Sequence, residues 1–174
     1  MIAFLLETMR AHADCDAIAS NTAVMTYAGL LEHVVEWQVI LGHAGLPPGA
    51  VVGMDGHYSP ETLAVLLALM QHRTIIVPLS RDAQSHHDEF CDTAQVEYHI
   101  RITAATSTVE PTGRRAQHPL YDILRQRETP GLVLFSSGST GKSKAVVHDL
   151  QLLLKKFQRP RRRWRTLLFL GLDH

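Results

Sequence analysis

The chain has 174 residues, with 17 basic and 17 acidic side chains, so its formal net charge is zero. This length suits one domain with a full core or part of a larger one. The balanced charge gives no overall attraction to nucleic acid or membranes, and no apolar window is long enough to predict a membrane span. Two cysteines, Cys15 and Cys91, argue against a disulfide framework and predict a reducing, cytoplasmic setting.

The first part of the chain predicts a helix, a hairpin and a second helix. A short amphipathic helix is expected over 2–13. Apolar segments on either side of Ser20-Asn21-Thr22 predict a small hairpin. Thr26 suits an N-cap, and apolar residues at helical spacing extend the second helix through about Leu41.

The middle of the chain predicts a strand, a helix and a strand. Residues 50–54 and 74–79 are apolar runs typical of buried strands. Between them, Ser59 and Pro60 predict the start of a helix that continues to Gln71 or His72. A βαβ unit of this kind indicates an α/β fold with a largely parallel sheet and helices on its faces.

The following segments are more polar. We expect a polar helix over 81–95, a strand over 98–102 and a short helix or extended segment over 122–127. Between these last two lies 103–119, rich in Thr, Ser, Ala, Pro and Gly, which predicts a long surface connection and a possible subdomain seam.

The last third places a loop between two strands. Strands are expected at 132–135 and 144–148, followed by a helix capped by Asp149. A basic link at 159–165 and a final strand at 166–170 are expected to complete the chain. Because the sequence stops at His174, just after that strand, we expect a truncated chain or a fragment of a longer enzyme.

The loop between these strands carries the residues of a phosphate-binding site. Glycines permit unusual backbone conformations, successive N–H groups can form an anion-binding concavity, and hydroxyl and ammonium groups donate hydrogen bonds to phosphate. The predicted phosphate-binding residues are Ser136, Ser137, Gly138, Ser139, Thr140, Gly141, Lys142 and Lys144.

One alternative for this loop is the P-loop of NTPases, with the pattern G-x-x-x-x-G-K-[ST]. Gly141-Lys142-Ser143 matches its end, but Ser136 stands where the first glycine belongs. A P-loop also leads directly into a helix, whereas 145–148 predicts a strand. The pattern therefore disfavours this class.

The same residues closely resemble the phosphate-loop signature of the adenylate-forming superfamily, which includes acyl- and aryl-CoA synthetases, adenylation domains of peptide synthetases, and luciferases. The usual form is Ser/Thr-Ser-Gly-Ser/Thr-Thr-Gly-x-Pro-Lys-Gly between two strands. This chain departs at two positions, with Ser143 for the common proline and Ala145 for the common glycine. Resemblance extends to 25–30, 46–52 and 59–79, in the family's order. It implies that 1–174 is the N-terminal part of an AMP-binding large domain.

The resemblance also implies a chemistry. Family enzymes join a small carboxylic acid to ATP, release pyrophosphate, and pass the acyl group to a thiol of CoA or of phosphopantetheine on a carrier protein. The loop would hold the β- and γ-phosphates with Mg²⁺, and His174 would line the acyl pocket. The adenine-binding segment, the Mg²⁺-binding glutamate and the C-terminal catalytic lysine lie downstream in the family. We therefore expect no complete catalytic set and no metal ligand in this chain, and expect it to be inactive alone.

A second function class remains open. The basic run over 155–165 is either a solvated connection or a surface for RNA, an anionic membrane or an acidic partner such as an acyl-carrier protein. The solvated connection is favoured, and nucleic acid is not an expected partner. The alternative to an acid-activating ligase is thus a non-catalytic module that binds phosphate or an acidic partner.

Overall fold

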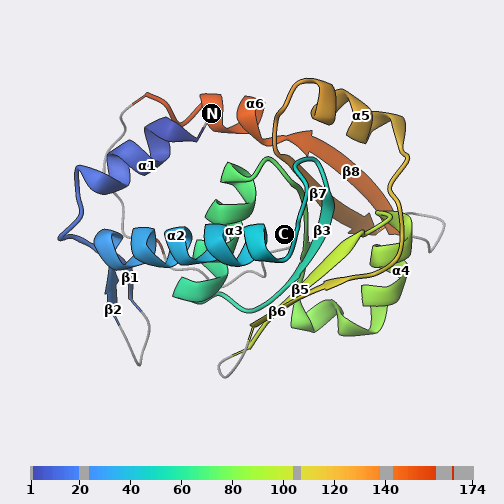
Figure 1. Ribbon diagram of the computed structural model, residues 1–174, viewed down its shortest axis with the longest axis horizontal. Coiled ribbons are helices and arrows are strands. Elements are labelled where there is room, and N and C mark those ends of the chain that lie inside the picture. The colour runs from blue at the N-terminus through green and yellow to red at the C-terminus, as the bar shows by residue number, and fades with distance from the viewer. Residues whose placement is uncertain (1, 20–23, 104–106, 138–142, 160–165, 167–174) are drawn as a thin grey trace.

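The computed structural model describes residues 2–19, 24–103, 107–137, 143–159 and 166. Figure 1 shows a central sheet with helices on both of its faces. The helices are α1 (Ala3–Arg10), α2 (Tyr27–His43), α3 (Pro60–Gln71), the 3₁₀ helix η1 (Arg81–His86), α4 (His87–Thr93), α5 (Pro119–Gln126) and α6 (Leu150–Lys155). The strands are β1 (Asp16–Ala19), β2 (Val24–Thr26), β3 (Val51–Asp55), β4 (Ile75–Leu79), β5 (Tyr98–Ile102), β6 (Ser107–Pro111), β7 (Gly131–Ser137) and β8 (Ser143–Asp149).

The main sheet has the strand order β6-β5-β3-β4-β7-β8. Strands β5, β3, β4 and β7 are parallel, and an antiparallel strand closes each edge, β6 against β5 and β8 against β7. The predicted α/β class with a largely parallel sheet is therefore confirmed. The predicted hairpin is also present, as the antiparallel pair β1–β2.

Each face of the sheet has its own hydrophobic core, because successive strand residues point to opposite sides. Val52, Met54 and Ile76 pack into the core formed with α1, α2, α3 and α6. Val51, Ile75 and Val77 pack into the core on the side of α4 and α5. Burial on both faces explains why these strands are continuous apolar runs rather than alternating ones.

Three helix starts predicted from the sequence are confirmed by side-chain caps. The backbone N–H of Gly29 donates to Thr26 Oγ1 at 3.3 Å. Ser59 Oγ accepts the N–H of Thr62 at 3.1 Å, with Pro60 at the first helical position. Asp149 Oδ1 accepts the N–H of Leu152 at 3.1 Å. Each cap satisfies an N–H group that the helix itself leaves without a partner.

Several predictions differ from the structure. The expected connection over 103–119 was wrong for Ser107–Pro111, which forms edge strand β6. The expected polar helix over 81–95 is a 3₁₀ turn followed by α4, which buries Phe90 and Cys91. Helix α5 starts at Pro119, earlier than expected. Residues 160–165 and 167–174, which include most of the predicted basic link and final strand, lie outside the described residues.

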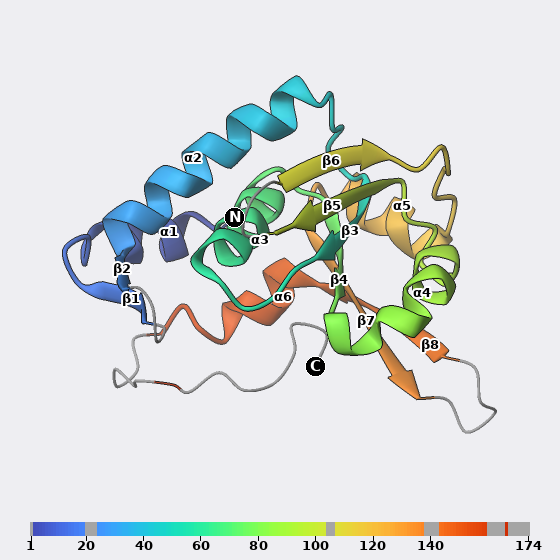
Figure 2. The ribbon, with the colours of Figure 1, turned by 90° about the horizontal axis from the view of Figure 1, so that it is seen from below.

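Strand β7 joins the sheet over a short distance. The β3–β4 ladder contains five residue pairs, whereas the β4–β7 ladder contains only Ile75 with Gly131 and Ile76 with Leu132. Proline has no backbone N–H to donate to a neighbouring strand. Pro78 lies beyond this short ladder, so β7 needs no hydrogen bond from it. Past the ladder, β7 continues paired with β8 alone among the described strands, and Figure 2 shows this pair extending beyond the ends of the other strands.

An ion pair ties the N-terminal ends of β3 and β5 to α5. Arg125 donates from Nε to the carbonyl oxygen of Gly49 at 3.0 Å and from Nη1 to that of Ala116 at 3.0 Å. Its Nη2 atom lies 3.3 Å from Glu97 Oε2. Glu97 also accepts the backbone N–H groups of Val51 and Ala116, at 2.9 and 3.0 Å. The pair thus satisfies backbone groups from two segments that are distant in sequence, the start of β3 and the residues before α5.

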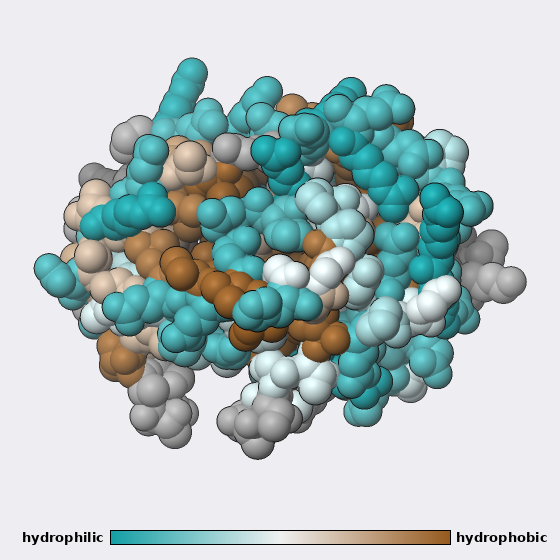
Figure 3. All heavy atoms as spheres, viewed as in Figure 1, coloured by the Kyte–Doolittle hydropathy of each residue, from teal (hydrophilic) through white to brown (hydrophobic). Residues whose placement is uncertain are grey.

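Helices α2 and α3 are joined through Trp37. This side chain is 1% exposed, and its indole N–H donates to Glu61 Oε1 in the first turn of α3. His33 Nδ1 lies 2.8 Å from the other carboxylate oxygen of Glu61. The outer face of α2 carries exposed Val35, Val39 and Ile40, and apolar side chains are visible over α2 in Figure 3. In the part of the chain that the structure describes, no helix has the length and apolar character needed to cross a membrane.

We predict a pH-dependent loss of stability from His99 on β5. Burial lowers the pKa of His99, with Arg101 adding to the effect, and its buried Nε2 atom has no hydrogen-bond partner among the described residues. As the pH falls through about 6.5, the unfolded chain binds a proton that the folded chain resists, so stability declines until the folded pKa is reached. The slope is at most about 1.4 kcal/mol per pH unit for one proton. Thermal melts from pH 8 to pH 5 should show a smaller decline for His99→Phe; parallel profiles would contradict this prediction.

Candidate phosphate-binding site

The predicted site lies at the end of the β7–β8 pair. The antiparallel register runs from Gly131 opposite Asp149 to Ser137 opposite Ser143. Ser136 stands opposite Lys144. The structure therefore brings together the two ends of the predicted motif, while its central residues Gly138, Ser139, Thr140, Gly141 and Lys142, and also His174, lie outside the described residues.

Both strands extend further into the motif than the sequence indicated. Ser136 and Ser137 were expected in the loop but belong to β7, and Ser143 begins β8 one residue earlier than expected. Ser136 and Lys144 are exposed. Along β8, Ala145 and Val147 pack against the α4-side core, which leaves Lys144 and Val146 exposed on alternate positions. The ammonium group is thus available to a ligand at this end of the hairpin.

Helix α4 contacts both strands of the hairpin. The Phe90 and Phe135 rings stack with centroids 4.0 Å apart and planes 7° apart, which joins α4 to β7. Glu89 Oε1 accepts the backbone N–H of Ser143 at 3.2 Å, which joins α4 to the first residue of β8. Sequence reasoning missed both contacts, although the apolar Phe90 in an otherwise polar helix was an available signal for a buried face.

The Glu89 carboxylate is held in its charged form. The hydrogen bond from the Ser143 N–H lowers the pKa of Glu89, and the neighbouring His86 lowers it further. His86 Nδ1 lies 3.4 Å from Glu89 Oε2. A negative charge therefore stands beside a motif whose other groups favour anions.

The donor set suits a polyphosphate. Hydroxyl groups, backbone N–H groups and ammonium groups all donate hydrogen bonds to phosphate oxygens. Among the residues that the structure describes, no three His, Cys, Asp or Glu side chains are placed to hold a metal ion. The donors of this motif therefore suit Mg²⁺ only if the ion is bound largely through the phosphate oxygens of the ligand. Mg²⁺ is commonly held in this way in nucleotide sites.

The strand that follows the motif separates it from the Walker class. In a Walker loop the residues after Gly-Lys-Ser/Thr begin a helix whose N-terminus faces the phosphates. Here Ser143 begins a seven-residue strand, and the first helix after the motif starts only at Leu150. The predicted loop therefore lies between two antiparallel strands at the edge of a sheet with a parallel centre, and this arrangement places the chain in a different structural class from the P-loop NTPases.

Comparison with known proteins identifies that class. The family model described as AMP-binding enzyme matches residues 5–170, so the chain belongs to this family. This confirms the predicted relation to the adenylate-forming superfamily. The chain spans only a small part of the length of the curated relatives that it matches.

Two relatives and one solved structure illustrate the similarity. Phenyloxazoline synthase MbtB of Mycobacterium sp. (strain MCS) is 28% identical over 142 residues, which is 76% of this chain and 12% of that protein. The hybrid PKS-NRPS synthetase iliA of Neonectria sp. (strain DH2) is 21% identical over 158 residues, which is 82% of this chain and 4% of that protein. The solved N-terminal subdomain of Klebsiella oxytoca NpsA, in complex with 3-hydroxybenzoyl-AMSN, has a TM-score of 0.61 and 27% identity, covering 82% of this chain and 39% of that one.

Proposed function

We propose that residues 1–174 form the phosphate-binding part of an acid-activating enzyme that adenylates a small carboxylic acid. Three findings support this: membership of the AMP-binding enzyme family, the strand–loop–strand arrangement of the motif, and the adenylate analogue in the NpsA complex. The observation that carries the proposal is the β7–β8 hairpin, which sets Ser136 opposite Lys144 at the mouth of the loop.

In the proposed reaction, a carboxylate oxygen of the acid attacks the α-phosphorus of ATP, and the bond from that phosphorus to the bridging oxygen breaks. Pyrophosphate leaves with the electron pair. The hydroxyl groups of Ser136, Ser137, Ser139 and Thr140, the backbone of Gly138 and Gly141, and the ammonium groups of Lys142 and Lys144 would hold the β- and γ-phosphates. Donors aimed at the leaving group stabilise its developing charge. Bound Mg²⁺ would add positive charge at the same oxygens.

The second step transfers the acyl group from the adenylate to a thiol, with AMP as the leaving group. We infer that the thiol belongs to phosphopantetheine on an acidic carrier protein rather than to CoA. Support comes from the relatives, which include a phenyloxazoline synthase and a hybrid PKS-NRPS synthetase, and from solved proteins of similar fold that contain adenylation and PCP domains. His174 would line the acyl pocket, and the adenine-binding and C-terminal parts would lie outside residues 1–174.

We further infer a cytoplasmic location. Cys15 and Cys91 are both free thiols, one exposed and one buried, which suits a reducing compartment. ATP and carrier proteins would be available there. Residues 103–119 remain a proposed subdomain seam, although part of this segment is the edge strand β6.

Calorimetric titration of the chain with pyrophosphate and with ATP plus Mg²⁺ tests the proposed function. We expect Lys144→Ala to weaken both ligands about tenfold, since it removes a charged donor from the loop. Lys156→Ala, an exposed lysine after α6 whose Nζ lies 5.0 Å from the Phe157 ring centroid, is the matched control and should change neither affinity. No pyrophosphate exchange is expected from the chain alone with benzoate-type acids. ATP hydrolysis to ADP and phosphate, or equal affinities for the two lysine variants, would overturn the proposal.

A further inference from the structure

The first residue of β8 presents a backbone N–H that its partner strand does not take. Ser143 lies opposite Ser137 in the β7–β8 register, yet its N–H donates to Glu89 Oε1 on α4. In an antiparallel pair, N–H groups that point away from the partner strand need another acceptor. Glu89 supplies that acceptor from a helix more than fifty positions earlier in the chain.

The same helix also fixes the other strand of the hairpin. Phe90, the next residue after Glu89, stacks on Phe135 of β7, and His86 stacks on Phe90 with ring centroids 5.8 Å apart. Phe90 is 8% exposed, so this contact is part of the core. One turn of α4 therefore holds β7 through an aromatic stack and β8 through a hydrogen bond.

Proline would remove the need for Glu89. It has no N–H and a fixed φ, and it is tolerated at the first residue of an edge strand. Position 143 is where the adenylate-forming signature commonly has proline, and here it is serine. Compared with proline, serine at this position has a backbone N–H and a less restricted φ. Glu89 accepts that N–H and thereby restrains the backbone at Ser143.

We propose that Glu89 is a positioning residue for phosphate binding: through the Ser143 N–H it holds the start of β8, and with it Lys144, in place opposite β7. This inference rests on the proposed function of the loop. Glu89 touches no phosphate in this role, because its Oε1 atom is engaged by the backbone. Its negative charge opposes a polyphosphate, so the benefit of the carboxylate is geometric rather than electrostatic.

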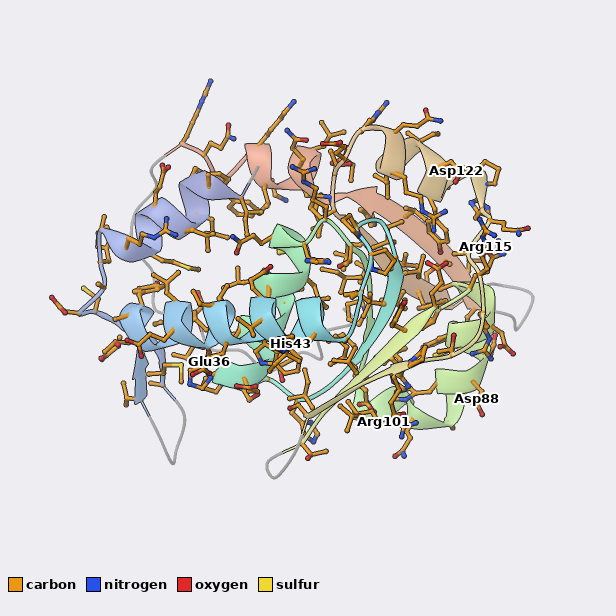
Figure 4. All side chains as sticks on the ribbon, viewed as in Figure 1. Glu36, His43, Asp88, Arg101, Arg115 and Asp122 are labelled. Atoms are coloured by element: carbon orange, nitrogen blue, oxygen red, sulfur yellow. The ribbon has the colours of Figure 1, made fainter. Side chains whose placement is uncertain are left out.

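Two substitutions separate geometry from charge. Glu89→Gln and Glu89→Ala both remove the negative charge, but only glutamine keeps an acceptor oxygen for the Ser143 N–H. We expect Glu89→Gln to bind pyrophosphate at least as tightly as the parent chain, and Glu89→Ala to bind it about three- to tenfold more weakly than Glu89→Gln. Asp88→Asn removes one charge from the same helix, at the position labelled in Figure 4, and should not weaken binding.

A third variant tests the hydrogen bond itself. In the Glu89→Ala background, Ser143→Pro removes the N–H left without an acceptor and restrains the backbone, so we expect pyrophosphate affinity to recover to the level of Glu89→Gln. Hydrogen–deuterium exchange of a peptide covering 143–146 should be faster in Glu89→Ala than in Glu89→Gln, whether or not ligand is present.

The outcomes separate this inference from the proposed function. Equal pyrophosphate affinity and equal exchange for the alanine and glutamine variants, with binding intact in the parent chain, would overturn the positioning role and leave the phosphate loop standing. If the parent chain binds neither pyrophosphate nor ATP, the proposed function fails and the inference fails with it. Weak binding by Glu89→Ala that Ser143→Pro does not restore would also count against the role of the N–H.

Discussion

Replacing Arg125 by alanine is expected to lower the free energy of unfolding by about 3 kcal/mol. Removing the guanidinium leaves Glu97, whose side chain is 16% exposed, without its positive partner. It also leaves the carbonyl groups of Gly49 and Ala116 without the donors that the structure gives them. Breaking one partner of a buried pair is more damaging than replacing both, because the remaining charge stays buried. Urea denaturation followed by circular dichroism measures the change.

Two further variants test this explanation. Arg125→Lys keeps the charge but cannot reach several acceptors with one planar group, so it should recover only part of the loss. Arg101→Ala breaks an exposed pair with Glu110, whose atoms are 4.0 Å apart, and should change stability by less than about 1 kcal/mol. Similar losses for Arg125→Ala and Arg101→Ala would contradict a special role for the buried pair.

The second large effect is expected at Trp37, where substitution by alanine should destabilise the chain by about 3–5 kcal/mol. The side chain fills the space between α2 and α3, and its loss leaves a cavity there. It also removes an indole N–H from Glu61 at the start of α3. Thermal and urea unfolding both report the loss, and α3 should open together with the rest of the core.

Matched substitutions show whether packing or the hydrogen bond dominates. Trp37→Phe keeps most of the ring but removes the donor, so it should cost clearly less than alanine. Val39→Ala lies on the same helix, where Val39 is 53% exposed, and should change stability by no more than about 0.5 kcal/mol. If Val39→Ala is as damaging as Trp37→Ala, the exposed face of α2 contributes more than the structure indicates.

Much of the fold could be predicted because local signals agreed with the tertiary structure. Ser59 followed by Pro60 marked the start of α3, and the apolar runs of β3 and β4 marked strands buried on both faces. Helix α5 was less visible, because its N-cap is His118, which accepts the N–H of Leu120 through Nδ1. Histidine is outside the usual set of N-cap residues, so the earlier start was missed.

The remaining differences come from long-range contacts that no local pattern contains. Strand β6 has a mostly exposed sequence and exists because it pairs with β5 at the sheet edge. The motif at 136–144 was predicted from residue types alone, but the Glu89–Ser143 bond joins residues that are far apart in the chain. Propensity and periodicity describe neighbours in sequence, so a contact of this kind is visible only in three dimensions.

Because the β4–β7 ladder is short, the pairing within the β7–β8 hairpin and the attachment of that hairpin to the sheet depend on different contacts. The hairpin that shapes the loop is local, since β7 and β8 follow each other directly in the chain. Its attachment to the sheet is not local, because it depends on the two β4–β7 residue pairs and on contacts from α4, which is distant in the chain. Closing the chain between Ile76 and Gly131 carries an entropy that grows only slowly with length, so insertions in the surface connections of that stretch cost little, provided that α4 keeps its contacts with the hairpin. Sequence changes in this stretch can therefore accumulate in the connections, while the residues of α4 that contact β7 and β8 are constrained.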